Sequence, residues 1–266
     1  MNNNRGFSLL ELLIVSAISG VVMAAIVSVY SAQQRAHRTQ KIVVDMQQNI
    51  RAAVYLMERE IRMAGYDRTS NADASIDTAG PGVIAFTTDT SEDGDTDDSN
   101  EDISYGFSTA NDAGRDGLAD NGAASLGRNT GGGFQPMAEN IHAVAFAYAY
   151  DADDDDSLDS SGGATIWAID SDDDKALDRN LDTDSDGDID INDAAGGAAL
   201  PATVNIDNIR AVKIWILART GRIVDNYTDA TTYVVGDKRV TVNDGYQRRL
   251  LTTTVKCRNM GLETGT

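Results

Sequence analysis

The chain has 266 residues, of which 42 are acidic and 22 basic, so its formal net charge at pH 7 is −20. The imbalance is regional, because residues 89–193 hold 29 acids and only four bases. Such a region repels nucleic acid phosphates and attracts divalent cations, so we expect no nucleic acid partner. The sequence has one cysteine, Cys257, which excludes an intrachain disulfide.

The chain begins with a short polar leader, residues 1–6, that ends in Arg5-Gly6. Residues 12–34 carry no charge, and the densest apolar stretch, about residues 9–30, is long enough to cross a hydrocarbon layer of about 30 Å. A single carboxylate, Glu11, lies near its start. A secretory signal carries its small-residue cleavage site after the apolar segment, whereas Gly6 precedes it here. Cleavage after Gly6 would therefore leave the apolar helix on the mature protein.

This arrangement resembles the class III signal of type IV pilins and type II secretion pseudopilins. The resemblance is carried by Gly6, Phe7, the run Ser8-Leu9-Leu10, and Glu11, the fifth residue of a chain that starts at Phe7. It implies that a prepilin peptidase cuts after Gly6 and methylates the new amino group of Phe7. A plain single-pass membrane anchor is the alternative interpretation.

Glu11 also has a physical interpretation. A carboxylate costs about 2.5–3.5 kcal/mol near the centre of a membrane helix. Cleavage would create a positive amino group at Phe7, one helical turn away, and in a bundle Glu11 could pair with Phe7 of a neighbouring subunit. This pairing predicts a filament. The alternative is that Glu11 reaches the membrane edge without a partner.

The helical pattern continues beyond the apolar stretch. Residues 33–64 contain no Pro or Gly, and Ile50, Val54, Met57 and Ile61 recur at spacings of four and three. We therefore predict one long helix. Residues 7–30 would form its membrane-spanning and assembly part, and residues 31–65 an amphipathic continuation whose apolar face packs on a sheet.

Residues 66–266 are expected to form a β-rich ectodomain. Short runs of β-branched and aromatic residues predict strands at residues 83–88, 103–107, 141–150, 165–169, 209–217 and 250–257. Asp, Gly, Ser and Asn dominate the stretches predicted to be long acidic loops, residues 89–102, 111–133 and 151–200. The fold class is therefore α+β. It corresponds to the pilin-like fold that the resemblance implies, a long helix packed on an antiparallel sheet.

Residues 182–193 have the spacing of an EF-hand-type calcium loop, in which alternating carboxylates precede a glycine turn at Gly187. The expected ligands are Asp182, Asp184, Asp186, Asp188, Asp190 and Asp193. Asp188 would act through its backbone carbonyl, and Asp190 directly or through water. Asp193 replaces the usual Glu, and no second helix follows. Calcium is the expected cofactor, and a solvated acidic loop is the alternative.

Two other stretches alternate in a similar way, at residues 151–159 and at Asp93, Asp95 and Asp97. They do not complete the calcium pattern, so we interpret them as solvated charge, with a weak or shared cation site as the alternative for each. The sequence contains no P-loop, no His-based zinc motif and no Ser-His-Asp arrangement. We expect no enzyme activity.

Later segments extend the resemblance to PilW-type minor pilins, at residues 59–66, 149–151, 209–219 and 248–259. It implies a minor pilin that is inserted in the bacterial inner membrane, with its ectodomain outside the cytoplasm, and then built into a type IV pilus. There it would act in the tip or initiation complex and promote pilus assembly, cell adhesion and twitching motility. The implied partners are prepilin peptidase, other minor pilins, the major pilin and a PilY-type tip adhesin.

Two alternatives remain at this stage. A type II secretion minor pseudopilin resembling GspJ would be processed in the same way but serve a different machine. A membrane-anchored calcium-binding or adhesive surface protein would not polymerise at all.

Overall fold

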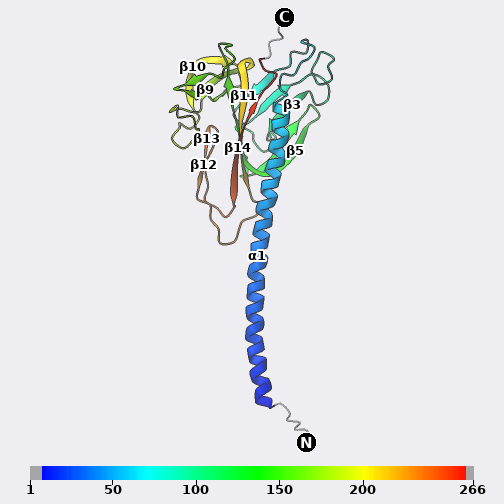
Figure 1. Ribbon diagram of the computed structural model, residues 1–266, viewed down its shortest axis with the longest axis vertical. Helices are drawn as coiled ribbons and strands as arrows, with labels where there is room; N and C mark the ends of the chain where they lie inside the picture. The colour runs from blue at the N-terminus through cyan, green and yellow to red at the C-terminus, as the bar shows by residue number, and fades with distance from the viewer. Residues whose placement is uncertain (1–7, 262–266) are drawn as a thin grey trace. The chain divides into compact units, whose positions relative to one another are not determined.

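The computed structural model describes residues 8–261 (Figure 1). Its first element is the long helix α1 (Leu9–Ile61), and strands make up most of the regular structure that follows. The chain divides into two compact units, Met1–Val44 and Asp45–Thr266, and α1 contributes residues to both. The predicted long helix is confirmed, and it ends at Ile61, a turn before the expected position.

In the first unit, α1 is apolar on all sides from Leu12 to Tyr30. Its large side chains are exposed around the whole circumference, with Leu9 at 81% and Val21 at 72%. The helix is long and apolar enough to cross a membrane, and none of its most apolar stretch is buried. Such a surface needs an apolar environment, either lipid or neighbouring helices.

The second unit is built on one large antiparallel sheet of ten strands. These strands are β1 (Ile76–Ala79), β2 (Ile84–Thr87), β3 (Asp102–Gly106), β4 (Ala124–Asn129), β5 (Phe134–Tyr150), β8 (Ala168–Ile169), β9 (Ala176–Asn180), β10 (Ala198–Asn205), β11 (Ile209–Arg219) and β14 (Arg248–Lys256). Two separate pairs are β6 (Ser160–Ser161) with β7 (Ala164–Thr165) and β12 (Thr232–Val235) with β13 (Lys238–Thr241). A short 3-10 helix, η1 (Ile206–Asn208), precedes β11.

Strand β5 is the centre of this sheet, because three other strands pair with it. Its first half pairs with β4, and Tyr148 pairs with Ala168 of β8 on one edge and with Val212 of β11 on the other. Strand β14 then pairs with the far edge of β11. The sequence of β5 alternates large and small residues, so its two faces differ.

One face of the central strands packs against the part of α1 that belongs to the second unit, residues 45–61 (Figure 1). Thr253 of β14 is paired with Ile214, which is paired with Phe146, and the Thr253 hydroxyl donates a hydrogen bond to Glu58 of α1 at 2.5 Å. Residues directly opposite each other share a face, so this face meets the helix. The helix residues predicted to hold the sheet, Ile50, Val54, Met57 and Ile61, are all buried.

The other face carries the small residues of β5 against two tryptophans. Ala145 is paired with Trp215, and Trp167 packs into the same cluster. The remaining buried members come mainly from β5, β11 and the hairpin of β12 and β13, and they are Ala143, Ala147, Ala149, Ile169, Leu181, Ala211, Leu217, Val235, Val240 and Val242. We call this set the tryptophan cluster. The acidic residues 182–193 follow directly on Leu181.

Two of the predicted long loops are wrong in part. Residues 111–133 contain β4, and residues 151–200 contain β6, β9 and the start of β10. They also contain β7 and β8, which lie at the strand predicted for residues 165–169. Strand β4 has the sequence ASLGRN and β9 has ALDRN, neither of which shows β-branched residues. Pairing with neighbouring strands overrides their weak local preference.

Candidate functional site

The residues predicted for processing are only partly described by the structure. Gly6 and Phe7 lie outside the described residues. Glu11 lies in the first turn of α1, on an exposed surface whose neighbouring side chains are apolar. It is the only acidic or basic residue between Ser8 and Gln34. The structure thus puts one carboxylate at the start of an apolar helix surface.

The second candidate site is the acidic loop at residues 182–193, which begins where β9 ends. Asp182 is only 2% exposed. Its Oδ2 accepts a hydrogen bond from the N–H of Gly187 at 2.9 Å, whereas its Oδ1 is buried and has no hydrogen-bond partner. A buried carboxylate oxygen without a partner is costly, about 1–3 kcal/mol or more. This oxygen is therefore available to a cation.

Asp193 closes the loop from the other end. Its Oδ1 accepts hydrogen bonds from the N–H of Thr183 at 2.5 Å and from the Thr183 hydroxyl at 3.1 Å, and its Oδ2 accepts one from the N–H of Asp190 at 2.8 Å. One carboxylate oxygen from each of Asp182, Asp184 and Asp193 lies within 4.8 Å of the other two. Three convergent carboxylates are a donor set suited to calcium.

The local backbone explains how the loop closes. Gly187 has a φ of 97°, a left-handed conformation that glycine adopts without strain, and the chain reverses there. Ile189 packs on the tryptophan cluster and anchors the loop to the sheet. Arg239 of β13 donates hydrogen bonds to the carbonyls of Asp190 at 2.6 Å and of Asp193 at 2.9 Å. The loop is thus held by the hairpin beside it.

The electrostatics of the loop favour a cation. Burial raises the pKa of Asp193, but the N–H groups of Asp190 and Thr183 outweigh it, so the net pKa is lowered and the carboxylate stays ionised. The pKa of Asp184 is raised, by desolvation and by the nearby charges of Asp186, Asp193 and Asp182. A bound cation would reduce this electrostatic repulsion between the carboxylates.

The other three expected ligands do not join this close group. Asp186 and Asp188 have exposed side chains, and Asp186 accepts a hydrogen bond from the N–H of Asp188 at 2.9 Å. Asp190 is half-buried and its Oδ1 accepts one from the N–H of Asn192 at 2.7 Å. An exposed Asp188 side chain fits the expectation that this residue contributes its carbonyl.

Sequence reasoning missed one cluster of carboxylates. This cluster consists of Asp170, Asp172 and Asp174, which contribute one carboxylate oxygen each, all within 4.8 Å of one another. Asp151, Asp153 and Asp155 form a similar group. Both oxygens of the buried first residue accept backbone hydrogen bonds in each case, so neither group leaves an orphaned oxygen. The signal that could have found the missed cluster is the alternation of residues 170–174 inside the predicted loop.

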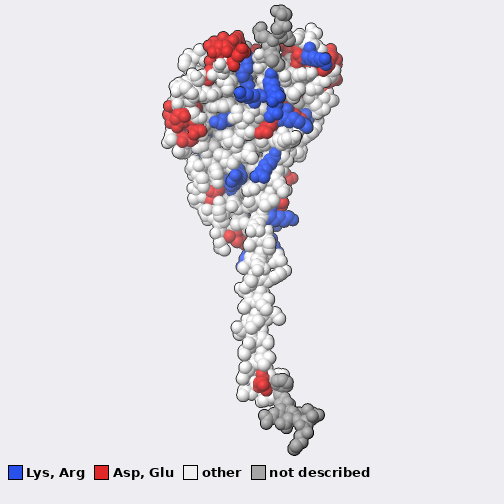
Figure 2. Space-filling model, viewed as in Figure 1, with Lys and Arg blue, Asp and Glu red and all other residues white. Residues whose placement is uncertain are grey.

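The acidic and basic residues separate on the surface. Figure 2 shows acidic side chains in discrete patches on the part of the second unit that carries β9 and β10, while Lys and Arg gather near the upper part of α1.

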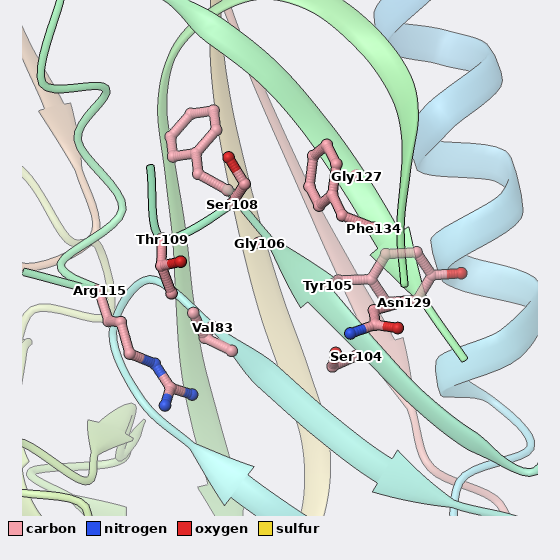
Figure 3. Close-up of a pocket in the computed structure, with 11 residues that line it drawn as sticks. Val83, Ser104, Tyr105, Gly106, Ser108, Thr109, Arg115, Gly127, Asn129 and Phe134 are labelled. Atoms are coloured by element: carbon pink, nitrogen blue, oxygen red, sulfur yellow. The ribbon is translucent and has the colours of Figure 1, made fainter. Parts of the chain in front are cut away.

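A pocket of about 280 Å³ lies beside β3 and β4 (Figure 3). Its lining consists of Val83, Ser104, Tyr105, Gly106, Phe107, Ser108, Thr109, Arg115, Gly127, Asn129 and Phe134. This lining contains no carboxylate, imidazole or thiol, so it offers no acid–base pair for catalysis. The acidic loop remains the better-defined site.

Two family models match the chain. The model of the family described as "Type IV Pilus-assembly protein W" matches residues 107–259, and that of the "Prokaryotic N-terminal methylation motif" matches residues 1–27. Among solved structures, the chain is similar to the type IV-like pilin TTHA1219 from Thermus thermophilus, with 15% identity and a TM-score of 0.41 over 81% of this chain and 97% of that one. No curated protein matches the chain.

Proposed function

The chain belongs to the type IV pilus-assembly protein W family, and from this premise we propose that it is a minor pilin of the pilus tip or initiation complex. In this role it is inserted in the inner membrane, cut after Gly6 by a prepilin peptidase and methylated at Phe7. It then joins other minor pilins and the major pilin, and a PilY-type tip adhesin is a further partner. The family is structural, which agrees with the absence of a catalytic motif from the sequence.

The observation that carries this proposal is the all-round apolar surface of α1 with one carboxylate at its start. The methylation motif overlaps this stretch, and both fit a membrane-anchored protein. A lipid-facing helix has no need of Glu11, whereas a packed helical filament can pair it with the amino group of a neighbouring Phe7. The match to the pilus-assembly family favours a pilus over the secretion machine of GspJ-like pseudopilins.

Incorporation into pili tests the proposal. The wild-type chain should appear in pili sheared from cells, whereas Glu11→Gln should remain in the membrane fraction at normal abundance, because its helix can still insert. Ser16→Ala is the matched control, since Ser16 lies in the same apolar stretch and bonds only to the carbonyl of Leu13 in its own helix. Equal amounts of Glu11→Gln and wild type in pili would contradict the assembly role of Glu11.

The same proposal includes calcium at the loop of residues 182–193. The single observation behind it is the buried, unpartnered Oδ1 of Asp182 beside the carboxylates of Asp184 and Asp193. Calcium would satisfy this oxygen and neutralise the repulsion within the loop. It would stabilise the folded chain by RT ln(1 + [L]/Kd).

Thermal unfolding of the full-length chain in detergent micelles tests this part. Calcium should raise the Tm of the wild type relative to EDTA. In Asp182→Asn and Asp193→Asn this rise should be smaller, by the share that this loop contributes. Asp188→Asn is the matched control, because its expected ligand is the backbone carbonyl, and it should retain the increment. An identical calcium response of the Asp182→Asn variant and the wild type would remove calcium from this loop.

A further inference from the structure

A second acidic loop has the same internal bonding as residues 182–193. It joins β2 to β3 and runs from Asp89 to Glu101. The two sequences are DTSEDGDTDDSNE and DTDSDGDIDIND, so both begin with Asp-Thr and have Asp-Gly-Asp at positions five to seven. The sequence indicated Asp93, Asp95 and Asp97 in this loop but neither end carboxylate, since the closing one comes at position 13 instead of 12.

The first carboxylate has the same role in both loops. Asp89 is fully buried, and its Oδ2 accepts a hydrogen bond from the N–H of Gly94 at 3.2 Å, as that of Asp182 does from Gly187. Its Oδ1 accepts one from the N–H of Glu92 at 2.6 Å. Gly94 has a φ of 93°, close to the 97° of Gly187.

The closing carboxylate also corresponds. Oε1 of Glu101 accepts hydrogen bonds from the N–H and hydroxyl of Thr90, at 2.8 and 3.2 Å, as Oδ1 of Asp193 does from Thr183. A further bond comes from the N–H of Ser91 at 2.8 Å. Glu101 and Asp89 thus face one short segment, residues 90–94, from its two ends.

The two loops share one feature that their internal hydrogen bonds do not explain. Glu101 is only 1% exposed, and its Oε2 is buried without a hydrogen-bond partner. Oε1 of the same carboxylate is bonded to the start of the loop, so the group as a whole is turned into the loop. The orphaned oxygen is on the closing residue here and on the first residue in the loop of residues 182–193.

No basic side chain compensates the buried oxygen of Glu101. No ion pair with Arg or Lys involves this carboxylate among the described residues. A buried carboxylate oxygen without a partner favours a bound cation.

We propose that residues 89–101 form a second calcium site, in which the ion binds the buried carboxylates of Asp89 and Glu101 and draws in the exposed Ser91 and Asp93 at positions three and five. The carboxylates of Asp89, Asp93 and Glu101 do not all lie within 4.8 Å of one another in the structure, so Asp93 must move to bind the ion. Oxygen donors of this kind and number suit calcium, and the Glu at the end can bind with both oxygens. The site lies against the segment that leaves α1, because the N–H of Asp89 donates to the carbonyl of Tyr66 at 2.6 Å. Calcium would therefore stiffen this junction. The inference does not depend on pilus assembly.

Isothermal titration of the EDTA-treated full-length chain with calcium chloride tests the second site. Glu101→Gln should bind one calcium fewer than the wild type, and Asp193→Asn should also bind one fewer, at the other loop. Asp98→Asn is the matched control, because Asp98 is an exposed carboxylate of the same loop outside the expected ligand set. It should keep the wild-type stoichiometry.

A variant on an exposed residue guards against misfolding of Glu101→Gln. Asp93 is exposed, so Asp93→Asn should fold normally and weaken one calcium site about tenfold or more. If Glu101→Gln or Asp93→Asn loses calcium at one site while Asp193→Asn loses it at another, the proposal stands. If both variants bind as the wild type does while Asp193→Asn binds one fewer, only the loop of residues 182–193 binds calcium and the proposal is wrong. If the wild type binds none, both sites are wrong.

Discussion

The carboxylate of Glu60 in α1 accepts a hydrogen bond from Nε of Arg128 in β4, with 2.8 Å between oxygen and nitrogen. The hydroxyl of Tyr105 in β3 donates to the same carboxylate. The side chains of Glu60 and Arg128 are only 14% and 12% exposed. One carboxylate of the helix therefore joins α1 to two neighbouring strands of the sheet.

Glu60→Gln should lower the free energy of unfolding by about 1–3 kcal/mol, because Arg128 would keep its charge in a shielded site without an anionic partner. Denaturant unfolding of the full chain measures this loss. Glu139→Gln is a suitable control, since Glu139 is exposed and its side chain makes no hydrogen bond or ion pair among the described residues. Equal stability of Glu60→Gln and the wild type would show that the ion pair does not secure the helix.

The wall of the pocket beside β3 and β4 supplies a second prediction (Figure 3). A Cβ added at Gly127 would lie 2.2 Å from the ring of Phe134 and 2.8 Å from the carbonyl oxygen of Gln135. Gly127→Ala should therefore displace Phe134 and cost about 1–3 kcal/mol of stability.

Gly132→Ala is the matched control, because a Cβ there meets nothing within 4 Å. The double variant Gly127→Ala with Phe134→Ala should lose less stability than the two single losses added together. Additive losses would mean that the cost of Gly127→Ala does not arise from a clash with the ring of Phe134.

A third prediction concerns pH. Burial, then the charges of Arg248 and Arg219, lowers the pKa of His142 to about 4, below its unfolded value of about 6.5. A depressed folded pKa favours the neutral form, so this contribution is complete above about pH 6.5 and is lost as pH falls towards 4. The loss should be about 1–2 kcal/mol, once partial exposure of the ring is allowed for.

His142→Gln should flatten the dependence of stability on pH between about 6.5 and 4, measured in EDTA so that calcium does not contribute. Gln can still accept the hydrogen bond that Nε of Arg248 donates to Nδ1 of His142 at 3.2 Å. An unchanged slope would mean that His142 is not the group that titrates.

The fourth prediction concerns Lys213, which lies beside the loop of residues 182–193. Its Nζ lies 5.2 Å from the ring centroid of Trp167 and 5.4 Å from that of Trp215. Burial lowers its pKa, and the nearby carboxylates of Asp188 and Asp182 partly oppose this shift. A positive charge near the ion competes with calcium.

Lys213→Met should therefore raise the calcium affinity of the loop at residues 182–193, by about 3- to 10-fold, in calorimetric titration. Lys256→Met removes the same charge from an exposed strand end and serves as the control. A lower affinity in Lys213→Met would indicate that Lys213 holds the loop in place instead of repelling the ion.

The long helix and the central strand could be predicted from the sequence, because their residues recur at regular spacings. The spacing of Ile50, Val54, Met57 and Ile61 indicated a buried helix face, and the alternation in residues 141–150 indicated the central strand. Strands β4 and β9 could not be predicted, because their residues have weak strand preference. Their strand conformation is imposed by pairing with the neighbouring strands β5 and β8.

The candidate sites divide in a similar way. Alternating Asp residues indicated the loop at residues 182–193, but only the structure reveals which oxygen is buried and unpartnered. In the loop of residues 89–101, the sequence indicated only the alternation of Asp93, Asp95 and Asp97. Asp89 comes two residues after β2, and its burial depends on contacts with Tyr66 and Thr69, which the sequence does not reveal.

The central claim is that this chain is processed as a pilin, and the mass of its amino terminus tests it most directly. The protein should be purified from membranes with and without a co-expressed prepilin peptidase. The account predicts a chain that starts at N-methylated Phe7 only when the peptidase is present, and no such product when Gly6 is replaced. An intact Met1 or Asn2 terminus in both preparations would contradict it.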